Sequence, residues 1–412
     1  MSRASPLDPS PPGASIGLAA LARMAFEGVD LKPLWDRLIE RATLDPTDAA
    51  ALMDLATMLL LNGQGENGLA VQAQALDLRR LYHRPARQEA AQGETPSLNL
   101  LAIMTAGDMM ANTPLDFLLD GADIALTSLY VDAAGALPAP LPAHDLAFLA
   151  IGESAANLPV LRAIEPALAH WPRPVLNGAA RRITELTRDG VCDLLEGAPQ
   201  ILAPRAAPLS RPQLAALGDG ALALEAVLPG AAFPIIARPL GSHAGGGLLK
   251  LDTPAAIAPY LAGQDAEVFY VSPFVDYASP DGLYRKHRIV VIEGLPFVCH
   301  MAVSPRWMVH YLNADMLDNP SNRQEEADFM AAFDTDFAAR HEAAFKALHE
   351  RLGLDYFGID SAELADGRLL VFEVDVAMIV HDMDPPDLFP YKKPQMRKVF
   401  DAFQAMLRRR AG

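Results

Sequence analysis

The sequence predicts a mixed α/β and α+β protein, in which a helical segment and a small α/β layer with a parallel sheet precede a larger, strand-rich region. Three observations lead to this prediction. Apolar residues recur at helical spacing over residues 16–84, strand-like and helical runs alternate over residues 97–176, and strand-like runs predominate from Phe233 onward. At 412 residues, the chain is long enough for about two or three domains.

Composition excludes several classes of protein. Hydrophobic residues make up 51% and charged residues 21% of the chain, which predicts a sizeable packed core. The net charge of −17 argues against a protein that mainly covers nucleic acid or an anionic membrane. Cys192 and Cys299 form no CxxC pattern, and neither a secretory signal nor an apolar span of membrane length is found. We therefore expect a soluble, cytoplasmic protein.

The sequence of the N-terminal part predicts a leader followed by helices. Residues 1–15 are rich in Pro and Ser and predict disorder, whereas residues 16–84 predict several helices. The run from Asp45 to Asp48 supplies an N-cap, Gly63 closes one helix, and small residues over 68–75 stand where paired helices would touch. This pattern predicts a helical hairpin.

Residues 85–96 predict a linker, and residues 97–176 predict the α/β layer. Strands are expected over 98–104, 122–131, 144–153 and 174–177, with helices between them. Ligands of such sheets bind beyond the carboxyl ends of the strands. The loops 106–110 and 152–157 are therefore candidates for substrate contacts, with ordinary turn chemistry as the alternative.

Over residues 177–412, the sequence predicts a helical or mixed connecting segment to about residue 228, followed by strands. These strands are expected over 233–240, 247–251, 267–275, 284–294 and 295–304, and one long helix over 329–353. Two further strands, 355–364 and 368–380, flank the turn Ala365-Asp366-Gly367, a typical hairpin signal.

The stretch RPLGSHAGGG, residues 238–247, joins two of the expected strands. Its glycines leave the backbone amides open to close approach by a ligand, of which phosphate is the usual one. It is neither GxxxxGK[ST] nor the GxGxxG of a dinucleotide fold. The alternative is an ordinary flexible hairpin loop.

Three carboxylates accompany the last hairpin. Glu373 and Asp375 are two residues apart in one strand and share a face, with Phe372 and Val374 pointing the other way. Asp360 on the preceding strand lies across from them if the hairpin is in register. Carboxylates gathered in this way repel each other unless a cation lies among them, and Mg²⁺ or Mn²⁺ suits such oxygen ligands. The alternative is a solvated, exposed sheet face.

A glycine-rich hairpin followed by this carboxylate hairpin resembles the ATP-grasp superfamily, the ligases that include glutathione synthetase, D-alanine:D-alanine ligase and the ribosomal-protein glutamate ligases. The resemblance covers about residues 170–407 and implies an ATP-grasp domain over 177–412. Residues 97–176 then resemble the pre-ATP-grasp domain of these enzymes. The helical segment, 16–84, resembles a single degenerate tetratricopeptide unit, which could recruit a protein partner.

The resemblance implies roles for individual residues. Arg188 and Arg238 stand where the family usually has lysines that contact phosphates, and Arg288, with Lys286 second, would meet the transferred phosphoryl group. The metal ligands would be Asp360, Glu373 and Asp375, although the family normally has asparagine at the last position. The remaining nucleotide contacts would come from Gly241, Ser242, His243, Gly245, Gly246, Gly247, and from Phe274 and Val275 in the hinge that holds adenine.

These roles imply an ADP-forming ligase that uses ATP and Mg²⁺ or Mn²⁺ and joins a small-molecule or peptide carboxylate to an amine through an acyl phosphate. Homodimers are common among such enzymes. Candidate substrate contacts are His300, Ser304, Arg306, His310, Tyr311, His381, Lys392 and Lys393. Two alternatives remain open, an ATP-binding regulator that recruits a protein through its helical N-terminus, and a small-molecule phosphotransferase.

Overall fold

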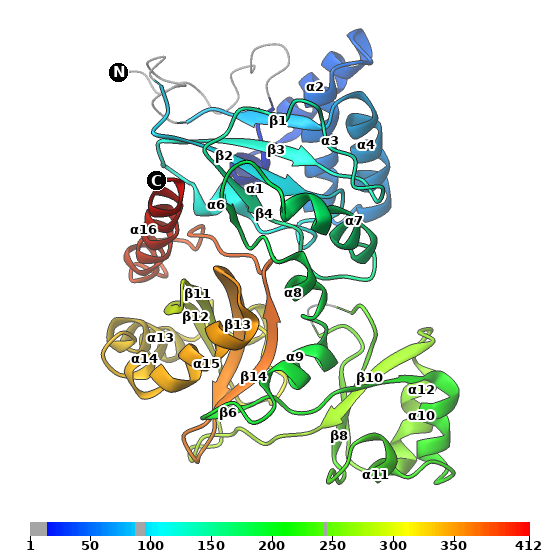
Figure 1. Ribbon diagram of the computed structural model, residues 1–412. Helices are drawn as coiled ribbons and strands as arrows, with labels where there is room; N and C mark the ends of the chain where they lie inside the picture. The colour runs from blue at the N-terminus through cyan, green and yellow to red at the C-terminus, as the bar shows by residue number, and fades with distance from the viewer. Residues whose placement is uncertain (1–14, 87–94, 243–244) are drawn as a thin grey trace. The chain divides into compact units, whose positions relative to one another are not determined.

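The computed structural model describes residues 15–86, 95–242 and 245–412, which fold as a mixed α/β protein with parallel and antiparallel strands (Figure 1). All of the predicted leader except Ser15, and most of the predicted linker, lie outside the described residues. The chain forms two compact units. Unit 1 comprises Met1–Ile183, Val376–Pro385 and Met396–Gly412, and unit 2 comprises Thr184–Asp375 and Pro386–Gln395. None of the helices in the described part of the chain is long and apolar enough to cross a membrane.

Unit 1 begins with four helices that pack around an apolar cluster including Leu21, Leu38 and Leu55. Asp48 caps the third helix by accepting a hydrogen bond from the Ala51 amide at 3.0 Å, as predicted. The helices are α1 (Leu18–Phe26), α2 (Lys32–Leu44), α3 (Ala49–Leu61) and α4 (Gly65–Leu78).

The predicted hairpin of α3 and α4 is confirmed. At Gly68 an added Cβ would lie 2.7 Å from Leu60 Cγ, so only glycine permits this close approach of the two helices. Ala75, also on α4, is fully buried. The tetratricopeptide likeness of this pair stays a prediction.

The prediction of helix up to residue 84 is wrong at its end. Residues Leu81–Arg84 form strand β1, which pairs antiparallel with β3 (Ile124–Tyr130) at the edge of a sheet. The Tyr82 hydroxyl donates to backbone oxygens of both Ala49 and Ala75 and so fixes this strand beside α3 and α4. A tertiary pairing has overridden the local helical pattern.

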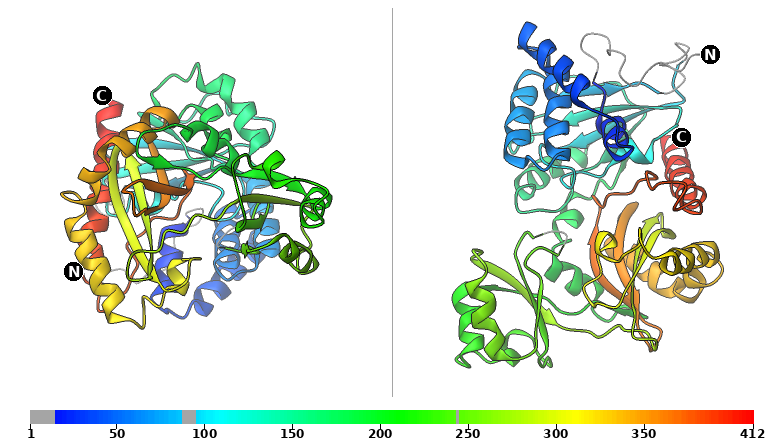
Figure 2. Two further views of the ribbon diagram at one scale, coloured as in Figure 1. Left: turned by 90° about the horizontal axis from the view of Figure 1, so that it is seen from below. Right: turned by 180° about the vertical axis from the view of Figure 1, so that it is seen from behind.

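The predicted parallel sheet of unit 1 is confirmed. Its strand order is β1-β3-β2-β4-β5, and the last four strands run parallel. The remaining strands are β2 (Leu98–Met104), β4 (Leu146–Leu149) and β5 (Val175–Leu176); the remaining helices are α6 (Leu115–Leu118), α7 (Leu158–Leu168), α8 (Ala180–Thr184) and α16 (Lys392–Ala411), whose first turn belongs to unit 2. Figure 2 shows the α1–α4 helices, in blue, beside the cyan strands.

Unit 2 contains two sheets. The first has the order β7-β10-β8-β9, is antiparallel, and is covered by α10 and α12 around an apolar cluster that includes Ile235, Tyr260 and Phe269. Its elements are β7 (Ala207–Ser210), α10 (Arg211–Gly218), α11 (Leu224–Val227), β8 (Ile235–Pro239), β9 (Leu249–Leu251), η1 (Pro254–Ala256), α12 (Ile257–Ala262) and β10 (Val268–Pro273).

The second sheet has the order β12-β11-β13-β14-β6. The predicted turn between its last two long strands is confirmed, with Gly367 at φ 82°. Its elements are α9 (Arg188–Leu195), β6 (Ile201–Leu202), β11 (Tyr284–Ile292), β12 (Leu295–Ser304), η2 (Tyr311–Asn313), α13 (Pro320–Ala332), α14 (Phe337–Arg340), α15 (Glu342–Leu352), β13 (Tyr356–Glu363) and β14 (Leu369–Asp375).

The prediction of one long helix over 329–353 is wrong, because the chain breaks there into α13, α14 and α15. Thr335 at the first break donates its amide and hydroxyl to the Ala332 carbonyl oxygen, and such local bonds compete with helix. At the second break His341 is fully buried and contacts Glu363 on β13 at 3.2 Å. A local hydrogen bond thus accompanies the first break, and a tertiary contact accompanies the second.

Candidate functional site

The glycine-rich turn joins β8 to β9, which pair antiparallel in unit 2. Gly241, Gly245 and Gly247 have φ of 72°, 76° and 65°, a region that glycine adopts readily. At Gly247 an added Cβ would lie 2.7 Å from both Pro239 and the Gln264 Oε1 atom. The turn therefore requires glycine at position 247 for two independent reasons.

Arg238, at the end of β8, folds back on this turn. Its Nε donates to the Ser242 hydroxyl at 3.1 Å, and its Nη2 donates to the Ser242 carbonyl oxygen. Burial and the nearby Arg188 lower the pKa of Arg238 to about 10. No carboxylate of the described residues lies within ion-pair distance of Arg238. His243, predicted to contact the nucleotide, lies outside the described residues.

Arg188 begins helix α9, which Thr187 caps by accepting a hydrogen bond from the Gly190 amide. Its guanidinium donates to Glu373 Oε1 at 2.9 Å and contacts the Phe372 carbonyl oxygen at 3.4 Å. Arg188 therefore contacts β14 through Glu373 and Phe372, and it is also near enough to Arg238 to lower the pKa of that guanidinium.

Asp360 is the most buried carboxylate of the predicted set, with its side chain 2% exposed. Strand register places it opposite Arg288 on β11 and opposite Glu373 on β14. Arg288 donates to both its oxygens, at 2.8 and 3.0 Å, and the Lys286 ammonium lies 2.7 Å from Oδ2. Burial by itself raises the pKa of Asp360, but Arg288 and Lys286 together hold it well below its usual range.

A β-bulge interrupts the pairing of β13 and β14. Asp360 opposes Glu373, whereas Ser361 opposes Val371, so Phe372 is the extra residue. The sequence expectation that Phe372 points away with Val374 is wrong, because the Phe372 ring packs against Tyr277, 5.1 Å away, in the apolar cluster of this sheet that includes Ala302 and Ala362.

The predicted metal ligands offer the oxygen donors that Mg²⁺ takes. However, Asp360 is engaged by Arg288 and Lys286, and Glu373 is engaged by Arg188. Within the described residues, no three or more His, Cys, Asp or Glu side chains are grouped so that they could hold a metal ion. This arrangement does not fit a metal unless the cations release the carboxylates, and the metal site stays a prediction. Asp375 lies opposite Gly358 in the register.

The residues predicted to hold adenine follow β10. The Phe274 amide donates to the Pro234 carbonyl oxygen at 3.0 Å, and its ring lies 5.5 Å from Trp307 and 4.5 Å from the Lys250 ammonium. Val275 is partly buried in the apolar cluster of the second sheet. The Phe274 amide is therefore committed to the fold.

The predicted substrate residues fall in both units. His381 belongs to unit 1, where its ring lies 6.0 Å from Phe26 and 6.3 Å from Phe117. In unit 2, His300 lies opposite Arg288, and its ring is 4.6 Å from Tyr311. Burial, with Arg288 second, holds the pKa of His300 well below its usual value.

The loop after β12 carries three more of these residues. Ser304 is buried, and its hydroxyl accepts a hydrogen bond from the Arg306 amide at 3.1 Å. The Arg306 guanidinium donates to the Asn313 carbonyl oxygen at 2.8 Å. The His310 amide donates to the Asn313 side chain at 2.9 Å. These hydrogen bonds hold the loop in one conformation.

Lys392 has a partner that the sequence analysis missed. Its ammonium lies 3.4 Å from a carboxylate oxygen of Glu326, which is fully buried. The Tyr311 and Tyr391 hydroxyls both donate to the other Glu326 oxygen, at 3.0 and 2.6 Å. The neighbouring Lys393 is exposed. A signal for Glu326 was available, because it stands four residues before Met330 and therefore on the buried face of α13.

Comparisons with known proteins give similar structures but no similar sequences. No protein-family model matches the chain, and a search of curated proteins finds no match. One similar solved structure is a RimK domain ATP-grasp protein from Sphaerobacter thermophilus, at 15% identity and TM-score 0.41, covering 75% of this chain and 99% of that one.

Two other similar structures are ligases by name. The D-alanine-D-alanine ligase from Coxiella burnetii has 10% identity and TM-score 0.46, and covers 76% of this chain and 96% of that one. The D-Ala:D-Ser ligase VanG from Enterococcus faecalis has 12% identity and TM-score 0.43, and covers 75% of this chain and 99% of that one. A likeness of this degree assigns no residue role and no activity to this chain.

Proposed function

We propose that the protein is an ADP-forming carboxylate–amine ligase that uses ATP. The proposal depends on one observation: the Arg238 guanidinium has no carboxylate within ion-pair distance among the described residues. It lies beside the glycine-rich turn and close to a second cation, Arg188. A bound polyphosphate would neutralise the charge of Arg238 and compete with Glu373 for Arg188, and arginine binds phosphate oxygens with two N–H groups at once.

The proposed reaction needs two anions to meet. A substrate carboxylate oxygen attacks the γ-phosphorus of ATP, the bond to the β-phosphate oxygen breaks, and ADP leaves. An amine then attacks the acyl carbon, loses a proton, and expels inorganic phosphate. Arg288 and Lys286 would stabilise the charge that develops on the transferred phosphoryl group, because preorganised cations act strongly in a desolvated site.

ATP turnover tests the proposal. The purified protein is incubated with MgATP and pooled amino acids, small peptides and organic acids, and ADP, phosphate and product masses are measured. We expect ADP only when an acid and an amine are both present, together with an amide product. ADP with an acid alone, and a phosphorylated acid as product, would indicate a phosphotransferase instead.

A pair of variants ties the activity to the site. Arg238→Met should weaken ATP binding by about 10- to 100-fold, since a hydrogen bond to a charged group contributes about 1.5–3 kcal/mol. Arg285→Met is the matched control, because Arg285 pairs with Asp281 and Glu325 and points away from the face of Lys286. Equal ATP affinity of the two variants would contradict the site assignment.

A second candidate function is ATP binding without turnover. The engagement of Asp360 by Arg288 and Lys286 favours it, because these groups would have to separate before Asp360 could serve a metal. Saturable binding of MgATP, with no ADP formed in any pool, would establish this second function. The search would then turn to protein partners of residues 16–84.

A further inference from the structure

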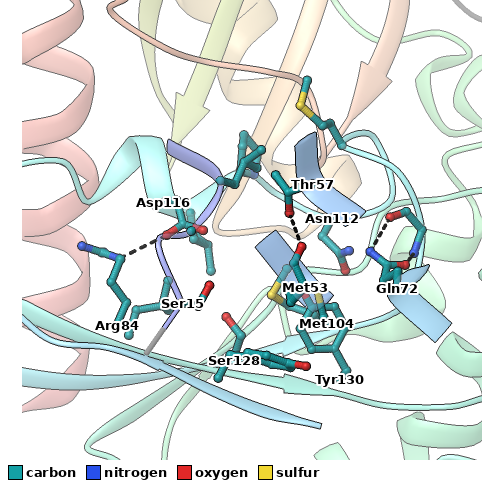
Figure 3. A pocket seen from close by; sticks show the side chains of 18 of the residues that line it. Ser15, Met53, Thr57, Gln72, Arg84, Met104, Asn112, Asp116, Ser128 and Tyr130 are labelled. Atoms are coloured by element: carbon teal, nitrogen blue, oxygen red, sulfur yellow. Dashed lines mark hydrogen bonds and ion pairs between the residues drawn. The ribbon is translucent and has the colours of Figure 1, made fainter. Parts of the chain in front are cut away.

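A cavity of about 120 Å³ lies within unit 1, between the helices that precede β1 and one face of the sheet (Figure 3). Leu126, Ser128 and Tyr130 line it from one face of β3, and Met104 lines it from the end of β2. The loop 106–110, predicted from the sequence as a candidate for substrate contacts, also lines the cavity. The cavity thus reaches the carboxyl ends of two parallel strands, where ligands of such sheets bind.

Arg84 on β1 and Asp116 on α6 form an ion pair in the cavity wall. Arg84 Nε lies 3.1 Å from Asp116 Oδ1, and the two side chains are 31% and 21% exposed. The Nε and Nη2 atoms of Arg84 are buried and make no hydrogen bond to the described residues, and none of those residues donates one to Asp116. The pair therefore keeps an open donor at Nη2 and an open acceptor at Oδ2.

The charges of the cavity do not favour an ionic ligand. Arg84 and Asp116 compensate each other, and the other lining residues that carry charge near neutral pH, His83 and Asp108, are exposed. An ammonium ligand would leave the N–H groups of Arg84 unpaired. A carboxylate ligand would lie beside the like charge of Asp116. A neutral ligand that has both a donor and an acceptor avoids both costs.

Two amide side chains add donors to the wall. The Gln72 nitrogen donates to the Gly107 carbonyl oxygen at 2.9 Å, and the Asn112 nitrogen donates to the Thr105 carbonyl oxygen at 2.8 Å. A side-chain amide nitrogen has two N–H groups, so each of these residues keeps one. The wall therefore contains donors besides those of Arg84.

The hydroxyl groups of the cavity add further acceptors and donors. Ser15 and Thr57 donate their protons to other groups of the protein, so only their lone pairs remain for a ligand. The Ser128 and Tyr130 hydroxyls make no hydrogen bond to any residue that the structure describes, and both side chains project from β3 in Figure 3. Burial and then the Asp116 charge raise the pKa of the Tyr130 hydroxyl, so these two groups are neighbours.

We propose that this cavity binds the carboxamide group of a small neutral amide. The carbonyl oxygen of the ligand accepts a hydrogen bond from Arg84 Nη2, and its nitrogen donates one to Asp116 Oδ2. Arg84 Nε stays beside Asp116 Oδ1, so the ligand closes a ring of contacts with the existing ion pair. It adds the two hydrogen bonds that this pair lacks, and the second lone pair of its oxygen remains for another donor of the wall.

The rest of the cavity fits a short apolar chain. Its wall includes Met53, Met104 and Leu126, and methionine adapts readily to ligands of varied shape. A cavity of about 150 Å³ holds benzene, so this one suits about four to six non-hydrogen atoms. Propionamide falls within this size. The proposal does not rest on the ligase function, because none of the residues discussed for ATP binding lines the cavity.

Calorimetry with the full chain tests the proposal by comparing propionamide with three molecules of the same shape. Butanone keeps only the acceptor, propionate is an anion, and propionamidinium carries only donors. We expect saturable binding of propionamide, and binding of each of the others that is weaker by at least about tenfold. Equal binding of any of the three, or no saturable binding of propionamide by the folded protein, would overturn the proposal.

A double variant locates the site. Arg84→Met with Asp116→Leu removes the whole ion pair and so leaves no uncompensated charge in the wall. We expect it to bind propionamide more weakly by at least about tenfold, and butanone within about twofold of the wild-type protein. Unchanged propionamide affinity would overturn the assignment.

Arg80→Met with Asp132→Leu is the matched control. Arg80 immediately precedes β1 and Asp132 follows β3, and their side chains, which form an ion pair, are 44% and 39% exposed. This control should bind propionamide as the wild-type protein does. If Arg84→Met with Asp116→Leu does not fold, the comparison of the four probes on the wild-type protein still decides.

Discussion

The carboxylate of Glu326 and the ammonium of Lys392 lie 3.4 Å apart, with side chains 0% and 3% exposed. The ammonium also lies 4.0 Å from the centre of the Tyr311 ring. This pair joins α13 to the start of α16 inside unit 2. Buried pairs of this kind cost much when one partner is lost, because the other charge stays buried without compensation.

Lys392→Met should therefore lower the free energy of unfolding by about 3–5 kcal/mol, measured by urea denaturation. Lys393→Met is the matched control; its side chain is exposed and the change should stay within about 0.5 kcal/mol. If Lys392→Met is as stable as the wild-type protein, the pair contributes no structural stabilisation.

His287 makes stability dependent on pH. It is buried and stacked on Phe329 with ring centres 4.7 Å apart, and burial lowers its pKa from 6.5 to about 3, with Glu363 opposing the shift. Between these values the unfolded chain binds a proton that the folded chain does not. Its contribution is thus fully present above pH 6.5, and about 1.4 kcal/mol is lost per unit of pH below it.

His287→Phe should flatten the dependence of unfolding free energy on pH between 6.5 and 4, measured by denaturation at several pH values. His170→Phe is the control, since His170 is exposed in unit 1. An equally steep acid loss in His287→Phe and wild type would contradict the assignment of this loss to His287.

The glycine-rich turn offers an internal comparison. Gly247→Ala brings a Cβ within 2.7 Å of Pro239, whereas Gly241→Ala meets nothing within 4 Å, although both positions have positive φ. Gly241→Ala should cost about 1–2 kcal/mol from backbone conformation alone. Gly247→Ala should cost more and should also weaken ATP binding. Thermal unfolding and ATP titration of both variants measure this difference, and equal effects would contradict a role for close packing at Gly247.

Glu373→Ala should abolish ADP formation and leave the fold intact, because it removes a partly exposed carboxylate without opening a core cavity. Two explanations of this loss are distinguishable: the loss of a ligand of the proposed metal site, or the displacement of Arg188, which pairs with Glu373. Glu373→Gln, assayed over a Mg²⁺ titration, separates them. Recovery at high Mg²⁺ supports the metal route, and no recovery supports the Arg188 route. Unchanged turnover in Glu373→Ala would exclude both.

Local patterns were sufficient for several elements. The turn at Ala365-Asp366-Gly367, the Asp48 cap and the parallel strands of unit 1 follow from glycine placement, side-chain capping and alternating apolar runs. Each depends on residues that are close in sequence.

Tertiary structure decided the rest. β1 forms because β3 offers a free edge, and the helix expected over 329–353 breaks where His341 contacts Glu363. The bulge at Phe372 moves its ring to the other side of β14 from the side that alternation predicts. In each case several partners compete for the same backbone or side-chain group. The spacing of residues along the chain does not show which partner forms the contact.

The pattern of residues predicts the mixed α/β fold, the glycine-rich turn and the set of charged residues in the strand-rich region. How those charges pair is set by the three-dimensional fold, which joins Asp360 to Arg288 and Lys286, and Glu373 to Arg188 across 185 residues of chain. The pairing of buried charges depends on distance and desolvation in space. Residue types show which charges are present, and the fold decides which of them meet.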